Sequence, residues 1–413
     1  MSSKVYLMLL LLFVFSCVSE QKVWYGEVKE FAVPCKQGGE SNLFLSEFGD
    51  IYLSWLEYED DTLVSLRFSK WLGEKWSEST EIASGADWFV NWADFPTMAA
   101  GGKDGQHLVA HHLKKSSPGT YDYNVMISQS FDKGLTWGFP EVLHKDSVNA
   151  EHGFVSILSK GDEGIALSWL DGRNTKTAAD QTDKEAHHHG GSMSLRYTEL
   201  SPEGHIRNSV ALDDRVCDCC QTDMAMSKDG PVVVYRDRSE GEIRDIYLCK
   251  QRNGVWLEPK VVYQDNWEIA GCPVNGPAVD AKGDQLVVFW YTMVGEEPGL
   301  RYALSSDGGD SFFNVSSLDS RERVMGRVDV RMLDGNRAIL IWMEQGENNV
   351  SFIRAKMIDF SGREYEAITL VETEASRASG FPRMVIKDGR LFLTWTALQD
   401  ADERIKSLIM DLG

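Results

Sequence analysis

Residues 277–290 read Pro-Ala-Val-Asp-Ala-Lys-Gly-Asp-Gln-Leu-Val-Val-Phe-Trp. This is an apolar strand, a Gly-Asp turn, and a second apolar strand that ends in an aromatic ring. The same arrangement recurs in six other stretches of the chain, at 43–55, 95–111, 154–169, 223–235, 328–342 and 381–395. Their last residues are separated by 56, 58, 66, 55, 52 and 53 positions. A recurrence at this interval is typical of a repeat fold.

Further alternating stretches, such as 123–130 and 301–305, lie between the copies and bring each repeat to four strands. Helical periodicity is almost absent, so the chain is predicted to be an all-β, seven-bladed β-propeller. A six-bladed ring is the alternative if one copy is an insertion. After Trp395 only one strand remains, at 404–412. We expect residues 27–33 to complete that last blade, because pairing them would remove two open sheet edges.

The N-terminus has the pattern of an export signal. A short basic start, Met1–Lys4, precedes an apolar segment, Val5–Phe15, that is too short to span a bilayer. Cys17 follows and resembles the lipidated cysteine of a bacterial lipobox, although ordinary signal cleavage remains open. We therefore expect a signal peptide over 1–17 and one propeller domain over 23–413. The protein would be an exported lipoprotein of the bacterial cell envelope, in the periplasmic or outer-membrane leaflet, attached to the membrane through Cys17.

The chain carries a formal net charge of −21. A nucleic-acid partner is excluded on this ground, because phosphate recognition needs clustered Lys and Arg. Acidity of this size favours solubility of an exported protein instead. The oligomeric state is left open by the sequence.

Two segments carry a family resemblance. Residues 130–137, Ser-Phe-Asp-Lys-Gly-Leu-Thr-Trp, match the Asp-box, or BNR repeat, through Ser130, Asp132, Gly134 and Trp137. Residues 305–312 are a looser copy, carried by Ser305, Asp307, Gly309 and Phe312. The chain thus resembles the sialidase-like superfamily over most of its length. The box is a structural hairpin, so it favours the fold more strongly than any activity.

That resemblance implies a glycosidase site with an Arg cluster, a Tyr activated by Glu, and an acid. The catalytic candidates are Asp94, Arg236, Arg327, Arg383 and Tyr235. However, Ala32 stands where family sialidases place their first substrate-binding Arg, so authentic sialidase activity is not expected. Whether the protein is an enzyme at all stays open.

The loops that lead into each innermost strand should meet on one face of a propeller, which we call the loop face. The residues expected there to bind a carbohydrate or another anionic ligand in the central funnel are Trp92, Arg173, Arg236, Arg238, Arg244 and Asn275. A glycoside hydrolase is one form of this hypothesis, and a non-catalytic glycan- or protein-binding lipoprotein is another. Exposed rings at Trp88, Trp92 and Trp267 would favour glycans, because exposed indoles stack on sugar faces.

The loop face should also bring together cysteine and histidine side chains. The run Cys217-Asp218-Cys219-Cys220 and the loop with Cys272 enter consecutive blades, and His152 opens another. Cys and His ligands suit Cu or Zn, so these residues are candidate metal ligands. Disulfides are favoured over a metal site in an exported protein, with Cys272 bridged to one cysteine of the run and Cys249 buried alone.

Overall fold

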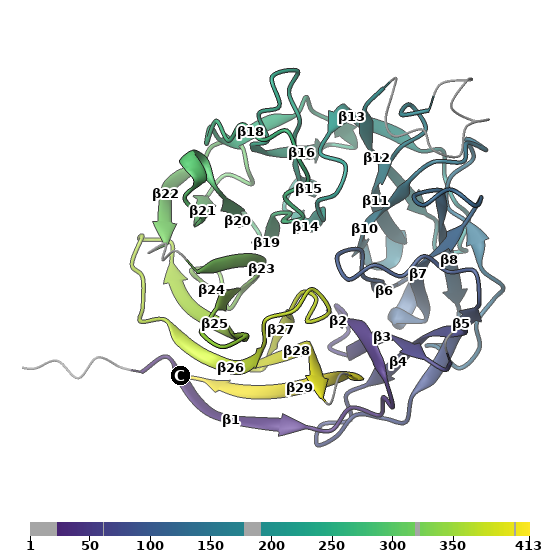
Figure 1. The fold of residues 1–413 in the computed structure, drawn as a ribbon, viewed down its shortest axis with the longest axis horizontal. Coiled ribbons are helices and arrows are strands. Elements are labelled where there is room, and N and C mark those ends of the chain that lie inside the picture. Colours follow the sequence, from purple (N-terminus) through teal and green to yellow (C-terminus); the bar gives the residue numbers. More distant parts are fainter. Residues whose placement is uncertain (1–22, 61, 177–190, 319–322, 400–401) are drawn as a thin grey trace, which may run out of the picture.

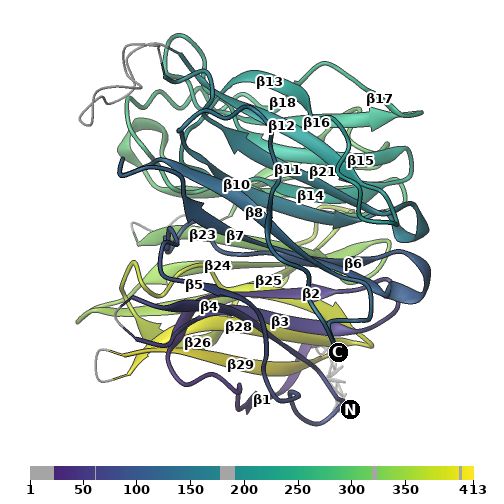
Figure 2. The same ribbon diagram turned by 90° about the vertical axis from the view of Figure 1, so that its right-hand side faces the viewer.

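The computed structural model describes residues 23–60, 62–176, 191–318, 323–399 and 402–413. Seven antiparallel sheets stand radially around a central axis, as Figure 1 shows. The predicted seven-bladed propeller is therefore confirmed, and the six-bladed alternative is wrong. Seen from the side, the strands run across the thickness of a disc, and the connecting loops lie on its two faces, at the left and right of Figure 2.

Each blade is an antiparallel sheet whose strands follow one another from the axis outward. The first three blades are β2 (Gly38–Leu45), β3 (Ile51–Tyr58), β4 (Val64–Lys70) and β5 (Thr80–Gly85); β6 (Met98–Gly101), β7 (His107–Lys115), β8 (Tyr123–Ser130) and β9 (Glu141–Val142); and β10 (His152–Ser159), β11 (Ile165–Asp171), β12 (Met193–Leu200) and β13 (Val210–Val216). Blades four to six are β14 (Asp223–Ser227), β15 (Gly230–Arg236), β16 (Ile246–Arg252), β17 (Val255–Trp256) and β18 (Lys260–Tyr263); β19 (Ala278–Lys282), β20 (Gln285–Thr292), β21 (Gly299–Ser305) and β22 (Phe313–Leu318); and β23 (Val324–Met332), β24 (Arg337–Gln345), β25 (Val350–Asp359) and β26 (Ile368–Glu374). Short 3-10 turns, η1 (Lys103–Gly105), η2 (Gly161–Glu163) and η4 (Val294–Glu296), connect strands.

The seventh blade joins the two ends of the described chain. It consists of β27 (Arg383–Lys387), β28 (Arg390–Gln399), β29 (Asp402–Leu412) and β1 (Tyr25–Phe31). Strand β1 pairs antiparallel with β29, with Tyr25 opposite Leu412 and Phe31 opposite Ser407 (Figure 1). The predicted closure of the ring by the N-terminal strand is confirmed.

The aromatic residue near the end of many second strands is a core residue. Trp55, Trp169 and Trp290 are fully buried between blades. Each indole N–H donates to a carboxylate, for example Trp55 to Glu57 at 3.0 Å and Trp169 to Asp171 at 2.8 Å. A buried indole needs such a partner, so the repeat pairs an aromatic ring with a nearby acid.

Aspartates on the innermost strands fasten one blade to the next. Asp223 accepts the backbone N–H of Val279 in the next blade at 2.9 Å. The same contact joins Asp280 to the N–H of Met332 and Asp329 to that of Met384. Charge-assisted bonds to backbone N–H groups are stronger than neutral ones, so these acids hold the ring at its narrowest point.

The two Asp-box-like segments form equivalent hairpins between third and fourth strands. In the first, Asp132 Oδ1 accepts the Thr136 N–H at 2.8 Å and Ser130 Oγ accepts that of Gly134 at 2.8 Å. Gly134 has φ 85°, a conformation that favours glycine. In the second, Ser305, Asp307 and Gly309 repeat these contacts.

These hairpins lie on the face opposite the loop face, which we call the hairpin face. Strand β29 is a third strand and ends at Leu412, so Tyr25, its partner, also lies on the hairpin face. Residues 1–22, with the predicted signal and Cys17, lie outside the described residues. Among the described residues, no helix is long and apolar enough to span a bilayer.

Candidate functional site

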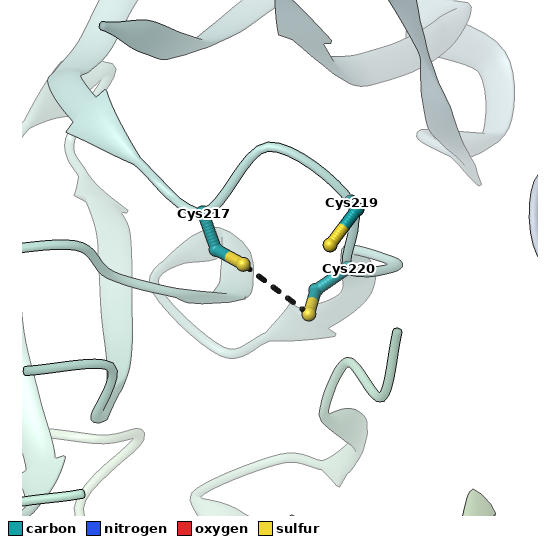
Figure 3. A group of neighbouring side chains, drawn as sticks. All are labelled: Cys217, Cys219 and Cys220. Atoms are coloured by element: carbon teal, nitrogen blue, oxygen red, sulfur yellow. Dashed lines mark hydrogen bonds between the residues drawn. The ribbon is translucent and has the colours of Figure 1, made fainter. Parts of the chain in front are cut away.

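Three cysteines of one loop bring their sulfur atoms together on the loop face. The loop follows β13, where the Cys217 N–H donates to the Arg236 carbonyl at 3.0 Å, and leads into β14. Cys217 and Cys220 are buried, and their Sγ atoms lie 3.4 Å apart (Figure 3). The Sγ atoms of Cys217, Cys219 and Cys220 all lie within 4.8 Å of one another. This spacing is short enough for one ion to contact all three.

A fourth thiol reaches the group from the next blade. Cys272 lies in the connection from β18 to β19 and is exposed, and it lies close enough to Cys219 for each thiol to shift the pKa of the other. The predicted proximity of Cys272 to the run is therefore confirmed. The predicted disulfide is absent, because the six described cysteines, including buried Cys249, are all free in the structure.

Charged side chains surround the thiols in compensating pairs. Arg244 donates to Cys217 Sγ at 3.0 Å and to Glu242 at 2.7 Å. Arg238 binds Glu242 at 2.8 Å and Asp218 at 2.9 Å. The two carboxylates therefore offset the two guanidiniums, and the loop has no large positive charge that would repel a cation.

The four thiols divide into two whose pKa is lowered, Cys217 and Cys272, and two whose pKa is raised. Burial opposes ionisation of Cys217, but hydrogen bonds from Cys219 and Cys220 and the charge of Arg244 together hold its pKa well below the usual value. Hydrogen bonding to Cys217 raises the pKa of Cys219, and burial raises that of Cys220. Interaction with the Cys219 thiol lowers the pKa of Cys272 as well, so the thiolate form is favoured at two of the four cysteines.

Two protonated acids and a tyrosine border the thiols. Burial raises the pKa of Glu151 to about 8, with further contributions from Asp94, Asp218 and Cys272. The Tyr123 hydroxyl donates to Glu151 Oε1 at 2.9 Å. Burial also raises the pKa of Asp94 to about 7; its Oδ1 accepts the Phe154 N–H at 2.8 Å. These carboxyl groups hold protons near neutral pH.

His152 does not join the thiols, so its predicted place in the cysteine cluster is wrong. It stacks on His144 with ring centroids 3.7 Å apart, and both belong to a separate group with Asp146. His144 Nδ1 contacts Asp146 at 2.6 Å, and Arg173 contacts the same carboxylate at 3.1 Å. Arg173 also binds Asp171 at 2.6 Å, so this predicted ligand residue is part of a buried charge network. A guanidinium within the group disfavours a metal cation there.

Two of the predicted catalytic arginines bind backbone carbonyls. Arg236 is buried, and its guanidinium donates to the carbonyls of Arg244, Asn275 and Tyr291 at 2.7–2.8 Å. Arg327 donates to the carbonyls of Ser376 and Gly380 at 2.9 and 3.0 Å, and lies 4.8 Å from the Trp92 ring. Burial lowers the pKa of Arg327 to about 10. The two guanidiniums connect blades and do not converge on one anion.

The other predicted candidates have partners of their own. Tyr235 donates to Asp213 at 2.5 Å, and Arg383 lies 3.6 Å from Asp329. Asn275 accepts the Arg327 N–H at 2.8 Å. The three tryptophan rings whose exposure would have favoured glycan binding are also packed against other side chains. Trp92 stacks on Phe381, and Trp88 stacks on His112. Trp267 is buried beneath Arg236.

A cavity of about 440 Å³ lies on the axis between the innermost strands. Its charged lining includes Asp223, Asp280, Arg331 and Arg383, and Asp94 also borders it. The aspartates there are the groups that fasten the blades, so the cavity is the inside of the ring. Arg383 therefore faces the axis and not the thiol group.

Sequence reasoning missed Tyr123, His144 and Asp146. Tyr123 opens a third strand, on the loop face, where the sequence reads only as an alternating pattern. His144 and Asp146 lie in the long connection after β9. The spacing of Asp146 two residues after His144 was the only sequence pattern that could have indicated this pair.

Comparisons with known proteins show the fold. No family model and no curated protein match the chain. A solved structure of a Dyadobacter fermentans protein of unknown function is 13% identical, with 94% of this chain and 99% of that chain covered and a TM-score of 0.52. A NanB sialidase mutant from Streptococcus pneumoniae is 11% identical, with 92% and 69% covered and a TM-score of 0.45. The α-L-arabinofuranosidase Arb93A from Fusarium graminearum is 12% identical, with 94% and 97% covered and a TM-score of 0.47. The likeness to the Dyadobacter fermentans protein, whose TM-score is above 0.5, shows the fold alone.

Proposed function

We propose that this protein is an exported β-propeller that binds a soft metal ion, Cu(I) or Zn²⁺, on its loop face. Cys217, Cys219 and Cys220 supply three sulfur ligands, and Cys272 supplies a fourth from the adjacent loop. One observation carries the proposal: the sulfur atoms of the run lie within 4.8 Å of one another at the end of a rigid blade.

The surroundings fit such an ion. Thiolate ligands select Cu(I) and Zn²⁺ over harder cations. Buried Cys217 and Cys220 are shielded from water, and ligands that are close in the folded chain need little ordering. The Arg244 N–H bonded to Cys217 Sγ acts as a support for a ligating sulfur, a role that tunes many metal sites.

We also propose that the chain is held at the membrane of the cell envelope by a lipid on Cys17. The described chain begins on the hairpin face, opposite the thiols. A lipid upstream of Tyr25 would therefore leave the thiol group directed away from the membrane, accessible to metal ions in the surrounding compartment.

The test is a metal titration of the reduced, purified protein. Cu(I) and Zn²⁺ are added in separate experiments in competition with a chromogenic chelator. We expect one ion per chain for at least one of the two metals, and an affinity that falls at least about tenfold in Cys217→Ser. Cys249→Ser is the matched control, because Cys249 is buried in a different place and hydrogen-bonds weakly to Tyr235. Equal affinity of wild type and Cys217→Ser for both metals would exclude the site.

A second candidate, a carbohydrate hydrolase, is favoured by one observation. Asp94, Tyr123 and Glu151 form a compact acid group beside the thiols, and a Cβ on Gly153 would lie 2.1 Å from Asp94 Oδ2 and 3.1 Å from Tyr123 Cε2. Carboxyl groups with raised pKa values are the usual proton donors of glycosidases. A panel of fluorogenic glycosides tests this candidate, with Glu151→Gln as the inactive control.

A sialoside should not be hydrolysed, because Ala32 replaces the first expected Arg and because Arg236 and Arg327 bind backbone carbonyls. Rapid sialoside hydrolysis would contradict that expectation.

A further inference from the structure

The four thiols form a path from the surface to the interior. Cys272 is exposed, Cys219 is half-buried, and Cys217 and Cys220 are buried. The Cys219 Sγ lies within 4.8 Å of those of Cys217 and Cys220, and Cys219 and Cys272 are close enough to shift each other's pKa. Cys217 and Cys220 are separated by two residues and 3.4 Å between sulfurs (Figure 3). A disulfide needs a separation of about 2.0 Å, so the two sulfur atoms must approach by about 1.4 Å to form a bridge.

We propose that this path carries out thiol–disulfide exchange with low-molecular-weight disulfides, with Cys272 as the first thiol to react and Cys217–Cys220 as the final bridge. The Cys272 thiolate attacks one sulfur of the disulfide RS–SR, forms a mixed disulfide and expels RS⁻. Cys219 then attacks Cys272 Sγ and expels the second RS⁻. The substrate has now been reduced to two thiols, and its electrons come from Cys219 and Cys272.

Two internal exchanges move the bridge inward. The Cys217 thiolate attacks Cys219 Sγ and releases Cys272, and Cys220 attacks Cys217 Sγ and releases Cys219. Each step forms one S–S bond and breaks another, and the protons of the two oxidised thiols end on the two RSH products. A direct Cys219–Cys220 bridge is not required, and adjacent cysteines bridge poorly. A second disulfide molecule can then oxidise Cys219 and Cys272.

The arrangement explains features that metal binding alone does not require. Metal binding does not require that the fourth ligand, Cys272, be exposed, whereas a thiol that attacks a disulfide from solution must be accessible. The Arg244 guanidinium on Cys217 Sγ stabilises the thiolate that must attack Cys219. Exchange would remove all four metal ligands, and that consequence rests on the proposed metal binding, whereas the exchange itself does not.

The test uses the reduced, metal-free protein and oxidised glutathione. The products are followed by intact mass and by mapping of disulfide-linked peptides. We expect a Cys217–Cys220 bridge after one equivalent and a second bridge, Cys219–Cys272, with excess. Cys272→Ser should slow the reaction at least about tenfold, because the remaining thiols of the path are less exposed. Cys220→Ser should stop the transfer before the final bridge.

Cys35→Ser is the matched control. Burial raises the pKa of Cys35 to about 12 and it lies outside the thiol path, so the rate should not change. An unaltered rate in Cys272→Ser, or bridges that map to other cysteines, would overturn the inference. The inference would also be overturned if the protein stayed fully reduced in excess oxidised glutathione although a maleimide labelled Cys272. If bridges form but neither metal binds, the exchange stands and the metal proposal fails. If a metal binds but no bridges form, the metal proposal stands and the exchange fails.

Discussion

The guanidinium of Arg244 donates a hydrogen bond to the sulfur of Cys217 at 3.0 Å, although the two residues are 27 positions apart. Cys217 follows the last strand of one blade, and Arg244 precedes the third strand of the next. The contact therefore couples a charge on one blade to a thiol on its neighbour. Together with the neighbouring Cys219 and Cys220 thiols, it favours ionisation of this buried thiol.

Arg244→Met should raise the pKa of Cys217, because the substitution keeps the length of the side chain but removes the positive charge. The measurement is the ultraviolet absorbance of thiolate in the reduced, metal-free protein as a function of pH. Arg323→Met is the control, since Arg323 is an exposed residue paired with Glu347. A titration curve of Arg244→Met that overlays the wild-type curve would contradict the assigned role.

Asp94 should make the protein less stable as the pH rises. Its folded pKa, about 7, lies above the unfolded value, so the folded state holds a proton that the unfolded state loses. The contribution of protonated Asp94 to the unfolding free energy is fully present below about pH 4. It is lost progressively as the pH rises to about 7, at up to about 1.4 kcal/mol per pH unit. Urea unfolding at several pH values should show a flatter dependence in Asp94→Asn. Equal slopes in the two proteins would show that Asp94 ionises freely in the fold.

Asp329→Ala should be among the most destabilising substitutions in the ring. Asp329 is buried, binds Arg331 at 2.9 Å, lies 3.6 Å from Arg383, and accepts the Met384 N–H. Its removal takes the nearest acid from both guanidiniums and leaves Arg331 with only Asp223 at 4.0 Å, and a loss of about 3–5 kcal/mol in unfolding free energy is expected. Glu347→Ala, which breaks an exposed pair, should cost about 0–1 kcal/mol. Comparable losses for both variants would contradict the buried role of Asp329.

Deletion of residues 27–33 should destabilise the whole ring, because it removes most of β1 and exposes the edge of β29. The expected result is a lower unfolding midpoint for the entire molecule, with a single transition, in a thermal or urea scan. Lys29→Ala serves as the control, since Lys29 is largely exposed beside Glu27. An unchanged midpoint after the deletion would mean that the ring closes without this strand.

The blades could be read from the sequence because each repeat ends in a ring that must be buried. Trp169 and Trp290 recur at the same point of their repeats, and burial of a large aromatic residue leaves few alternatives. The meeting of Cys272 with the run was also predictable, since consecutive connections enter neighbouring blades. Both predictions depend only on the order of the strands.

The directions of individual side chains could not be predicted in this way. Arg327 has φ 53° at a register shift in β23, and the local distortion carries its guanidinium to the carbonyls of Ser376 and Gly380. His152 opens β10 beside another register shift and stacks on His144. A bulge changes which side of a strand a residue faces, and an alternating pattern does not reveal it.

The pairing of β1 with β29 also determines the order in which the molecule can assemble. The seventh blade cannot be completed until strand β29 is available, which is more than 370 residues after Tyr25. Earlier blades form from neighbouring segments, but this contact must close the longest loop in the chain, and such non-local pairings are slow to form. Until then β1 is a solitary strand and the newest blade has an open edge. A chain delivered through a membrane from its N-terminal end would pass through this vulnerable state each time, and a holdase that covers β1 would protect it from aggregation.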